Sequence, residues 1–156
     1  MTDETIRRID HSALRTNQAF IITLLVAAFI TNLWPLVAFV SAVMIVGTIW
    51  PGAGLFKRVY RHVLKPLKVV RPDVIVDNPE PHLFAQGLGG AFTLGSTLAL
   101  LAGLPVLGWA LSWIVVGLAV LNLFLGFCAG CFVYYRLSRL GVPGFGATPV
   151  ERERGA

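Results

Sequence analysis

The chain has 156 residues, enough for one domain, and 56% of them are hydrophobic while only 13% are charged. A typical soluble domain is about a quarter charged, so this composition excludes an ordinary soluble protein and predicts a single membrane domain over 1–156. The formal net charge is +5. An excess of basic residues can bind nucleic acid, bind anionic lipid or orient a protein in a membrane, and the positions of these residues along the chain decide between the three.

The charged residues fall into three groups, separated by two uncharged blocks. Thr16–Phe56 and Pro81–Tyr135 contain no Asp, Glu, Lys or Arg. A membrane-spanning helix needs about 20 apolar residues, so each block is long enough for two spans. The basic residues all flank these blocks, which argues against nucleic-acid binding. The absence of charge inside them argues against an ion pump or a voltage sensor.

The first half of the chain, about 9–56, contains the first two predicted spans. They cover roughly 16–34 and 36–56, and Asn32-Leu33-Trp34-Pro35 supplies turn signals between them. Both spans are short, so a re-entrant hairpin that returns to the same side of the membrane is the alternative.

A basic linker, about 56–80, follows the second span. Its apolar and basic residues recur with helical spacing on two faces, which predicts an amphipathic helix over 56–66 at the lipid headgroups. Attraction to anionic lipid is expected to be about 1 kcal/mol per basic residue near the surface. A docking surface for an acidic cytoplasmic protein is the alternative. The basic residues are Lys57, Arg58, Arg61, Lys65 and Lys68.

The second half, about 81–136, contains the third and fourth predicted spans, at 84–103 and 106–135. A turn is expected at Gly103-Leu104-Pro105, and 137–156 is expected to be a flexible tail. Neither hairpin turn carries Lys or Arg, so the positive-inside rule places both termini and the linker in the cytoplasm, with the protein in the inner (plasma) membrane. The predicted architecture is all-α, with four transmembrane helices arranged as two hairpins.

The two halves begin alike. Ile9-Asp10 precedes the first span and Val76-Asp77 precedes the third, and each is followed by a glutamine at the mouth of the span, Gln18 or Gln86. This pattern favours a diverged duplication. Because each half crosses the membrane twice, the halves would be parallel repeats.

A strip of small residues follows one face of the third span, with a member every four residues. Such a strip lets another helix approach closely. The fourth span has two glycines at the same spacing, with an asparagine one turn before them. We expect the two spans to pack through these faces, and a homodimer contact is the alternative. The residues are Gly87, Ala91, Gly95, Ala99 and Gly103 in the third span, and Asn122, Gly126 and Gly130 in the fourth.

Cys128 and Cys131 are the only cysteines and form the candidate redox site. Residues three apart are neighbours on a helix, and a Cα separation of about 5 Å is one that a disulfide accepts. In a C-x-x-C pair the second thiol resolves the mixed disulfide formed by the first. In a continuous fourth span the pair lies near the helix C-terminus, where dipole and burial oppose a thiolate. Cys131, nearer the cytoplasm, is then expected to attack and Cys128 to resolve.

Neither a metal nor another cofactor is predicted. A closed structural site generally needs four ligands, and the sequence places no histidine near the pair. His11, His62 and His82 lie outside the predicted spans and are expected to be ordinary interfacial residues. The alternative for the cysteines is packing alone, because cysteine is a small apolar residue.

Several segments are similar to the bacterial membrane-protein family known as domain of unknown function 4395. They are Pro81-His82-Leu83-Phe84-Ala85-Gln86, Leu121-Asn122, Gly126-Phe127-Cys128-Ala129-Gly130-Cys131 with Tyr134, and the opening motif of Ile9-Asp10 and Arg15. The family tends to have Arg where this chain has Leu83, so any role of that Arg is absent or passes to His82. The resemblance implies thiol or sulfur chemistry, because members often accompany thioredoxin-like or sulfurtransferase proteins.

The favoured hypothesis is a membrane-embedded dithiol that exchanges electrons or sulfane sulfur with a cytoplasmic thioredoxin-like or rhodanese-like partner. One alternative is a non-catalytic accessory or scaffold subunit of a larger membrane complex. Another is a homo-oligomeric permease for a small sulfur compound, because four short helices without interior polar residues make a poor pore alone.

Overall fold

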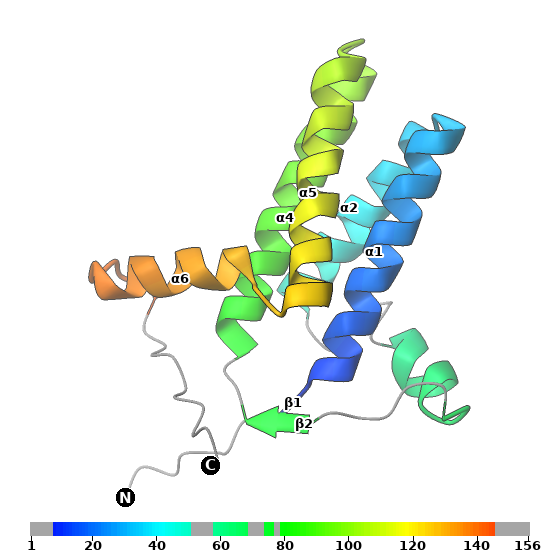
Figure 1. The fold of residues 1–156 in the computed structure, drawn as a ribbon. Helices are drawn as coiled ribbons and strands as arrows, with labels where there is room; N and C mark the ends of the chain where they lie inside the picture. Colours follow the sequence, from blue (N-terminus) through cyan, green and yellow to red (C-terminus); the bar gives the residue numbers. More distant parts are fainter. Residues whose placement is uncertain (1–7, 51–57, 69–73, 77–78, 146–156) are drawn as a thin grey trace, which may run out of the picture.

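The computed structural model describes residues 8–50, 58–68, 74–76 and 79–145 (Figure 1). Within these ranges the chain is mainly helical, with one short strand before each helical half. The elements in order are β1 (Arg8–Asp10), α1 (His11–Thr31), α2 (Trp34–Ile49), the π-helix η2 (Tyr60–Leu64), β2 (Val74–Val76), α4 (Pro79–Leu101), α5 (Pro105–Leu125) and α6 (Ala129–Arg139).

Helices α1, α2, α4 and α5 form a bundle, with α2 packed on α4 and α5 packed on both α1 and α4. The turns joining α1 to α2 and α4 to α5 lie at one end of the bundle (Figure 1). The strands and η2 lie at the other end, where α6 runs across the bundle axis and packs on α4. The short strands, η2 and α6 are therefore gathered at one end of the bundle, and the two hairpin turns lie at the other.

Three of the described helices, α1, α4 and α5, are long and apolar enough to cross a membrane. Helix α2 is apolar but has 16 residues, which gives it a length of about 24 Å, less than the hydrocarbon core of about 30 Å. Three of the four predicted spans therefore correspond to helices of sufficient length and apolarity. The span predicted over 106–135 is wrong in its last third, because α5 ends at Leu125 and the chain turns.

The two hairpins are built alike. Asn32 and Gly103 have positive φ angles of 52° and 79°, and the next residue in each case is the N-cap of the following helix. A proline occupies the first turn of both α2 and α5, a position where its missing N–H costs no helical hydrogen bond. The prolines and the left-handed residues thus explain why both uncharged blocks fold back near their midpoints.

The short segments that precede the two helical halves pair with each other. Strands β1 and β2 are antiparallel, with Ile9 opposite Ile75. The segments that begin the two halves in the sequence therefore meet at one end of the bundle, and α1 and α4 start from the two sides of this pair.

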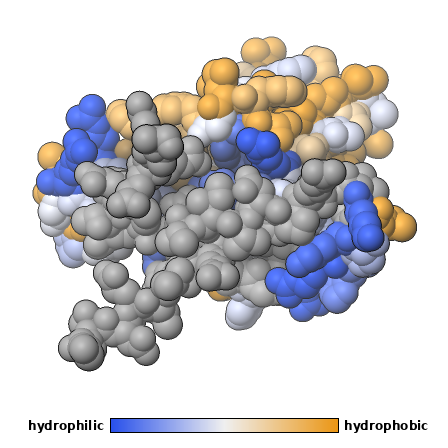
Figure 2. Space-filling model, turned by 60° about the horizontal axis from the view of Figure 1, so that its bottom comes forward, coloured by the Kyte–Doolittle hydropathy of each residue, from blue (hydrophilic) through white to orange (hydrophobic). Residues whose placement is uncertain are grey.

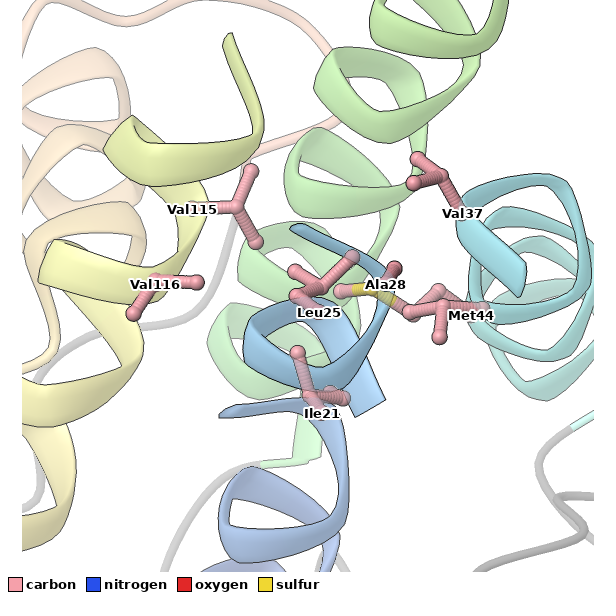
Figure 3. Close-up of a cluster of buried hydrophobic side chains, with 8 residues drawn as sticks. Ile21, Leu25, Ala28, Val37, Met44, Val115 and Val116 are labelled. Atoms are coloured by element: carbon pink, nitrogen blue, oxygen red, sulfur yellow. The ribbon is translucent and has the colours of Figure 1, made fainter. Parts of the chain in front are cut away.

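The buried core lies between α1, α2 and α5. In Figure 3, Leu25 and Ala28 of α1 point between Met44 of α2 and Val115 of α5. The outside is also apolar: Val106 is 84% and Phe124 is 78% exposed, and Figure 2 shows hydrophobic residues over the bundle and hydrophilic ones around the end that carries the strands. An exposed apolar surface of this kind is expected of a bundle in lipid.

A close helix contact in the bundle joins α4 to α2. A Cβ added at Gly90 would lie 2.9 Å from Ile45 Cγ1 and 3.4 Å from the Ile45 backbone nitrogen. Ser41 Oγ donates a hydrogen bond to the Gly90 carbonyl at 3.2 Å. Close backbone approach and a buried hydroxyl are the usual means of joining helices in a membrane.

The predicted strip of small residues is not one interface. Gly87 faces Thr48 of α2, and Gly95 faces Leu111 of α5 at an ordinary contact distance of 3.6 Å. Ala91 is exposed, and Gly103 lies in the turn with no described atom within 4 Å of an added Cβ. The contact between α4 and α5 instead uses Gly108 and a 2.7 Å hydrogen bond between the Ser96 and Ser112 hydroxyls.

The linker helix ends at Leu64, before the predicted end at residue 66. Its described part begins at Arg58 and continues through η2, with Tyr60 buried and the basic side chains exposed. Tyr60 thus contacts protein, whereas Val63 and Leu67, which the pattern placed on the same apolar face, are exposed. The exposed basic residues are Arg58, Arg61, Lys65 and Lys68, and Lys57 lies outside the described residues.

The contact between α2 and α4 can be tested by substituting Gly90. Gly90→Leu places a large side chain against the backbone of α2, and overpacking of this kind typically costs about 1–3 kcal/mol. We expect the midpoint of thermal unfolding in detergent to fall for Gly90→Leu. Gly117→Leu is the matched control, because Gly117 is exposed in the middle of α5. Equal midpoints for the two variants would contradict a close contact between these helices.

Candidate redox site at the start of α6

The site depends on a break in the helix after Leu125. Gly126 has a φ of +65° and caps α5, and its N–H donates to the Asn122 carbonyl at 3.1 Å. A left-handed residue at this position ends a helix, and glycine adopts it without steric cost. Gly126 was predicted to belong to a packing face, and this is wrong, because it turns the chain instead.

The turn places the cysteine pair at the beginning of a helix. Cys128 has extended backbone angles and is the N-cap of α6, and its Sγ accepts a hydrogen bond from the Cys131 N–H at 3.2 Å. The two cysteines form a disulfide with a Cα separation of 5.1 Å, close to the predicted value. The expectation that the pair lies near a helix C-terminus is wrong, since α5 has already ended.

This placement changes which of the two sulfur atoms a helix terminus favours. The N-terminal end of a helix favours negative charge, and reactive C-x-x-C cysteines gain from such a position. Cys128 lies at that end and receives the backbone N–H, so it is the sulfur better able to carry a thiolate. In an exchange reaction, this position would favour Cys128 as the attacking thiol and leave Cys131 as the resolving thiol.

Helix α6 is held against α4 by a very close contact. A Cβ added at Gly130 would lie 2.6 Å from the Cα of Ala85. One turn further along α6, the buried Tyr134 ring packs on the Phe84 ring, with centroids 5.8 Å apart. Gly130 thus packs on α4, the helix of the third predicted span, and it does not share a face with Gly126.

The contact with α4 brings a histidine to the cysteines. His82, in the first two turns of α4, has its Nδ1 3.6 Å from Cys131 Sγ. Its ring also meets the His11 ring edge-on, with centroids 5.9 Å apart. His82 was expected to be an ordinary interfacial residue, and that expectation is wrong. The resemblance of Pro81–Gln86 to a family motif was the one sequence signal that pointed to it.

The disulfide borders a cleft of about 680 Å³ between α1, α4, α5 and α6. A smaller cavity of about 70 Å³ lies on the bundle side and shares the amide residues Asn17, Gln18, Gln86 and Asn122 with the cleft. Phe124, Leu125 and Phe127 give the cleft an apolar part. Its polar lining consists of His11, Arg15, Asn17, Gln18, His82, Gln86 and Asn122.

Helix α6 has the character of a surface helix. Phe132 and Val133 are exposed on it, and so are Arg136 and Arg139 near its end. The Arg136 guanidinium carbon lies 5.1 Å from the centre of the Phe132 ring. Exposed apolar and basic side chains on a helix that crosses the bundle axis suit the boundary between lipid and water. The sequence had predicted such a helix only in the linker.

Comparison with known proteins identifies a family but no activity. The model of the family described as "Domain of unknown function (DUF4395)" matches residues 9–139, a range that contains every helix described above and the cysteine pair. No curated protein and no solved structure matches the chain. The function therefore has to be inferred from the site itself.

The assignment of thiol roles can be tested by alkylation. In the reduced Cys131→Ser variant, Cys128 should react with iodoacetamide at pH 7 faster than Cys131 does in Cys128→Ser. A helix terminus contributes about 0.3–1 kcal/mol to a charge, so the expected ratio is about two- to fivefold. The difference should disappear in denaturant, where no helix remains. A faster Cys131 in the folded protein would contradict the assignment.

Proposed function

The chain belongs to the DUF4395 family, and we propose that it is a membrane-bound dithiol–disulfide exchange protein whose working unit is Cys128 and Cys131. The observation that carries this proposal is the position of the pair. It starts a helix, forms a disulfide and lies beside an open polar cleft. A cysteine pair that only packs does not need to lie at a helix N-terminus. Here the pair has that position only because α5 ends at Gly126 and a new helix follows.

The proposed exchange begins with the reduced pair. The Cys128 thiolate attacks one sulfur of a partner disulfide, forming a mixed disulfide, and the other partner sulfur leaves as a thiolate that takes up a proton. Cys131 then loses its proton and attacks Cys128 Sγ, and the first partner sulfur leaves as the second thiol. This chain gives up two electrons and two protons in total, and the partner gains them. The reverse sequence reduces the Cys128–Cys131 disulfide.

The geometry of the pair supports each step. The Cys131 N–H stabilises charge on Cys128 when it attacks and when it is the leaving group. Cys131 is the neighbour that can reach Cys128 Sγ without rearrangement of the backbone, because the two already form a disulfide. The nearby His82 imidazole, 3.6 Å from Cys131 Sγ, is within reach of the proton that Cys131 loses.

The partner in this proposal is a cytoplasmic thioredoxin-like protein, and the end of the bundle that carries the strands and α6 faces the cytoplasm at the inner membrane. The basic residues support this orientation. Arg15, Arg58, Arg61, Arg136 and Arg139 are exposed on elements at that end (Figure 1), whereas neither hairpin turn at the other end carries Lys or Arg. Disulfides in the cytoplasm are usually transient, which suits an exchange reaction.

The exchange predicts that removal of the resolving thiol traps the partner. Cys131→Ala, expressed in its own host, should accumulate a mixed disulfide that disappears on reduction, because Cys128 can attack but the adduct cannot be resolved. Mass spectrometry of the adduct should identify a cysteine of a C-x-x-C protein. Cys128→Ala is the matched control and should trap little or nothing.

Two results would contradict the exchange. If neither variant traps a partner and the wild-type pair stays reduced under mild oxidants, the cysteines only pack, and the accessory-subunit function replaces the exchange. If Cys128→Ala traps a partner and Cys131→Ala does not, Cys131 is the attacking thiol and the proposed order of attack is wrong.

A further inference from the structure

We propose that the reduced pair and His82 form a zinc site of two thiolates and one imidazole with an open fourth position. The site requires only that the disulfide can be reduced, and it does not depend on the exchange reaction. It differs from the sequence-based expectation because His82, which is remote in sequence, is brought to the cysteines by the contact between α4 and α6.

The distances match a shared tetrahedral ion. One ligand atom from each of His82, Cys128 and Cys131 lies within 4.8 Å of the others. In a tetrahedral zinc site with Zn–S about 2.3 Å and Zn–N about 2.0 Å, a sulfur and a nitrogen ligand are about 3.5 Å apart. Cys131 Sγ and His82 Nδ1 are 3.6 Å apart. Reduction frees the two sulfur atoms to separate to about 3.8 Å, the corresponding spacing for two thiolates.

The scaffold holds the three ligands in place before an ion arrives. The cysteines occupy the N-cap and third position of α6, and C-x-x-C is a spacing that zinc sites commonly use. His82 lies on α4 three residues before Ala85, which meets Gly130 in the closest contact between the two helices. Ligands carried by rigid elements that pack tightly bind an ion with little loss of conformational freedom.

Charge favours zinc over copper(I) at this position. Two thiolates neutralise Zn²⁺, whereas the same ligands with Cu⁺ leave a net charge of −1. All three ligand residues are half-buried next to apolar side chains at the end of the bundle, where an uncompensated charge is costly. Binding releases the two thiol protons to solvent, so the reaction balances as Zn²⁺ plus two thiols giving a zinc dithiolate and two protons.

The fourth position opens on the cleft. A closed structural site has four protein ligands, whereas a site with three keeps a water or exogenous ligand. His82, Cys128 and Cys131 all line the 680 Å³ cleft, together with Arg15 and the amide of Gln86. A small ligand on the ion would therefore lie among hydrogen-bond donors, which suits a thiolate or another small anion.

Cobalt(II) provides a direct test, because thiolate ligation of Co²⁺ gives an intense charge-transfer band in the near ultraviolet. The reduced full-length chain in detergent should develop this band at one equivalent, and Zn²⁺ should displace it. The disulfide form and the Cys128→Ser/Cys131→Ser variant should show no band. His82→Ala should weaken Co²⁺ affinity at least about tenfold, since even a change outside the ligand shell typically costs 10–100-fold.

The controls separate this site from simple chelation by two thiols and from the exchange reaction. His62→Ala should bind Co²⁺ like the wild type, because His62 is exposed on the linker helix. His82→Gln, together with unfolding midpoints for both His82 variants, guards against loss of binding through misfolding. A band that persists at full affinity in well-folded His82→Ala and His82→Gln overturns the proposal, and so does the absence of a band in the reduced wild type. A partner trapped by Cys131→Ala without any metal binding would leave the exchange standing and exclude the zinc site.

Discussion

The reversal of the backbone at Gly126 is the constraint on which the candidate site depends. A positive φ of 65° at this residue ends α5 ten residues before the uncharged block itself ends. The remaining apolar residues then begin a new helix that crosses the bundle. Without the reversal, Cys128 and Cys131 would lie near the end of a long span, where the helix dipole opposes a thiolate. With it, the same two residues lie at a helix N-terminus.

The reversal also explains how residues from distant parts of the chain come together. Because α6 folds back onto α4, Gly130 packs against Ala85 and His82 reaches Cys131. The paired strands β1 and β2 bring the start of α1 to the same end of the bundle, so His11 meets His82. The cleft beside the disulfide is a consequence of this convergence, since its wall is built from α1, α4, α5 and α6.

The two proposed activities draw on the same thiolates, and they exclude each other at any one moment. A disulfide has no thiolate to offer a metal, and a thiolate bound to zinc is a poorer nucleophile than a free one. Oxidation of the pair would therefore release the ion, and the ion would hold the pair reduced. The site would then respond both to the redox state and to the metal supply on its side of the membrane.

Much of the architecture could be predicted because its signals are local. Proline and turn residues mark the two hairpins, and the positions of charged residues delimit the apolar blocks. The start of α6 could not be predicted in this way, since no charge or proline precedes it and glycine is common inside membrane helices. The contact of His82 with Cys131 depends on that turn, so it could not be predicted from the sequence either. The strip of small residues failed for a different, geometric reason. A step of four residues advances about 40° beyond a full helical turn, so Gly87 faces α2 while Gly95, two steps further, faces α5.

The break at Gly126 can be measured as a distance. Leu107, in α5, and Arg139, at the end of α6, are both exposed and can carry nitroxide labels through a ketone-bearing unnatural amino acid, which leaves the cysteine pair intact. A continuous helix would separate these positions by about 48 Å. With α6 folded across the bundle, pulsed electron paramagnetic resonance on the protein in lipid nanodiscs should give a distance at least about 10 Å shorter. A distribution centred near the straight-helix value would contradict the account, because Cys128 would then not begin a helix and His82 would not lie beside the pair.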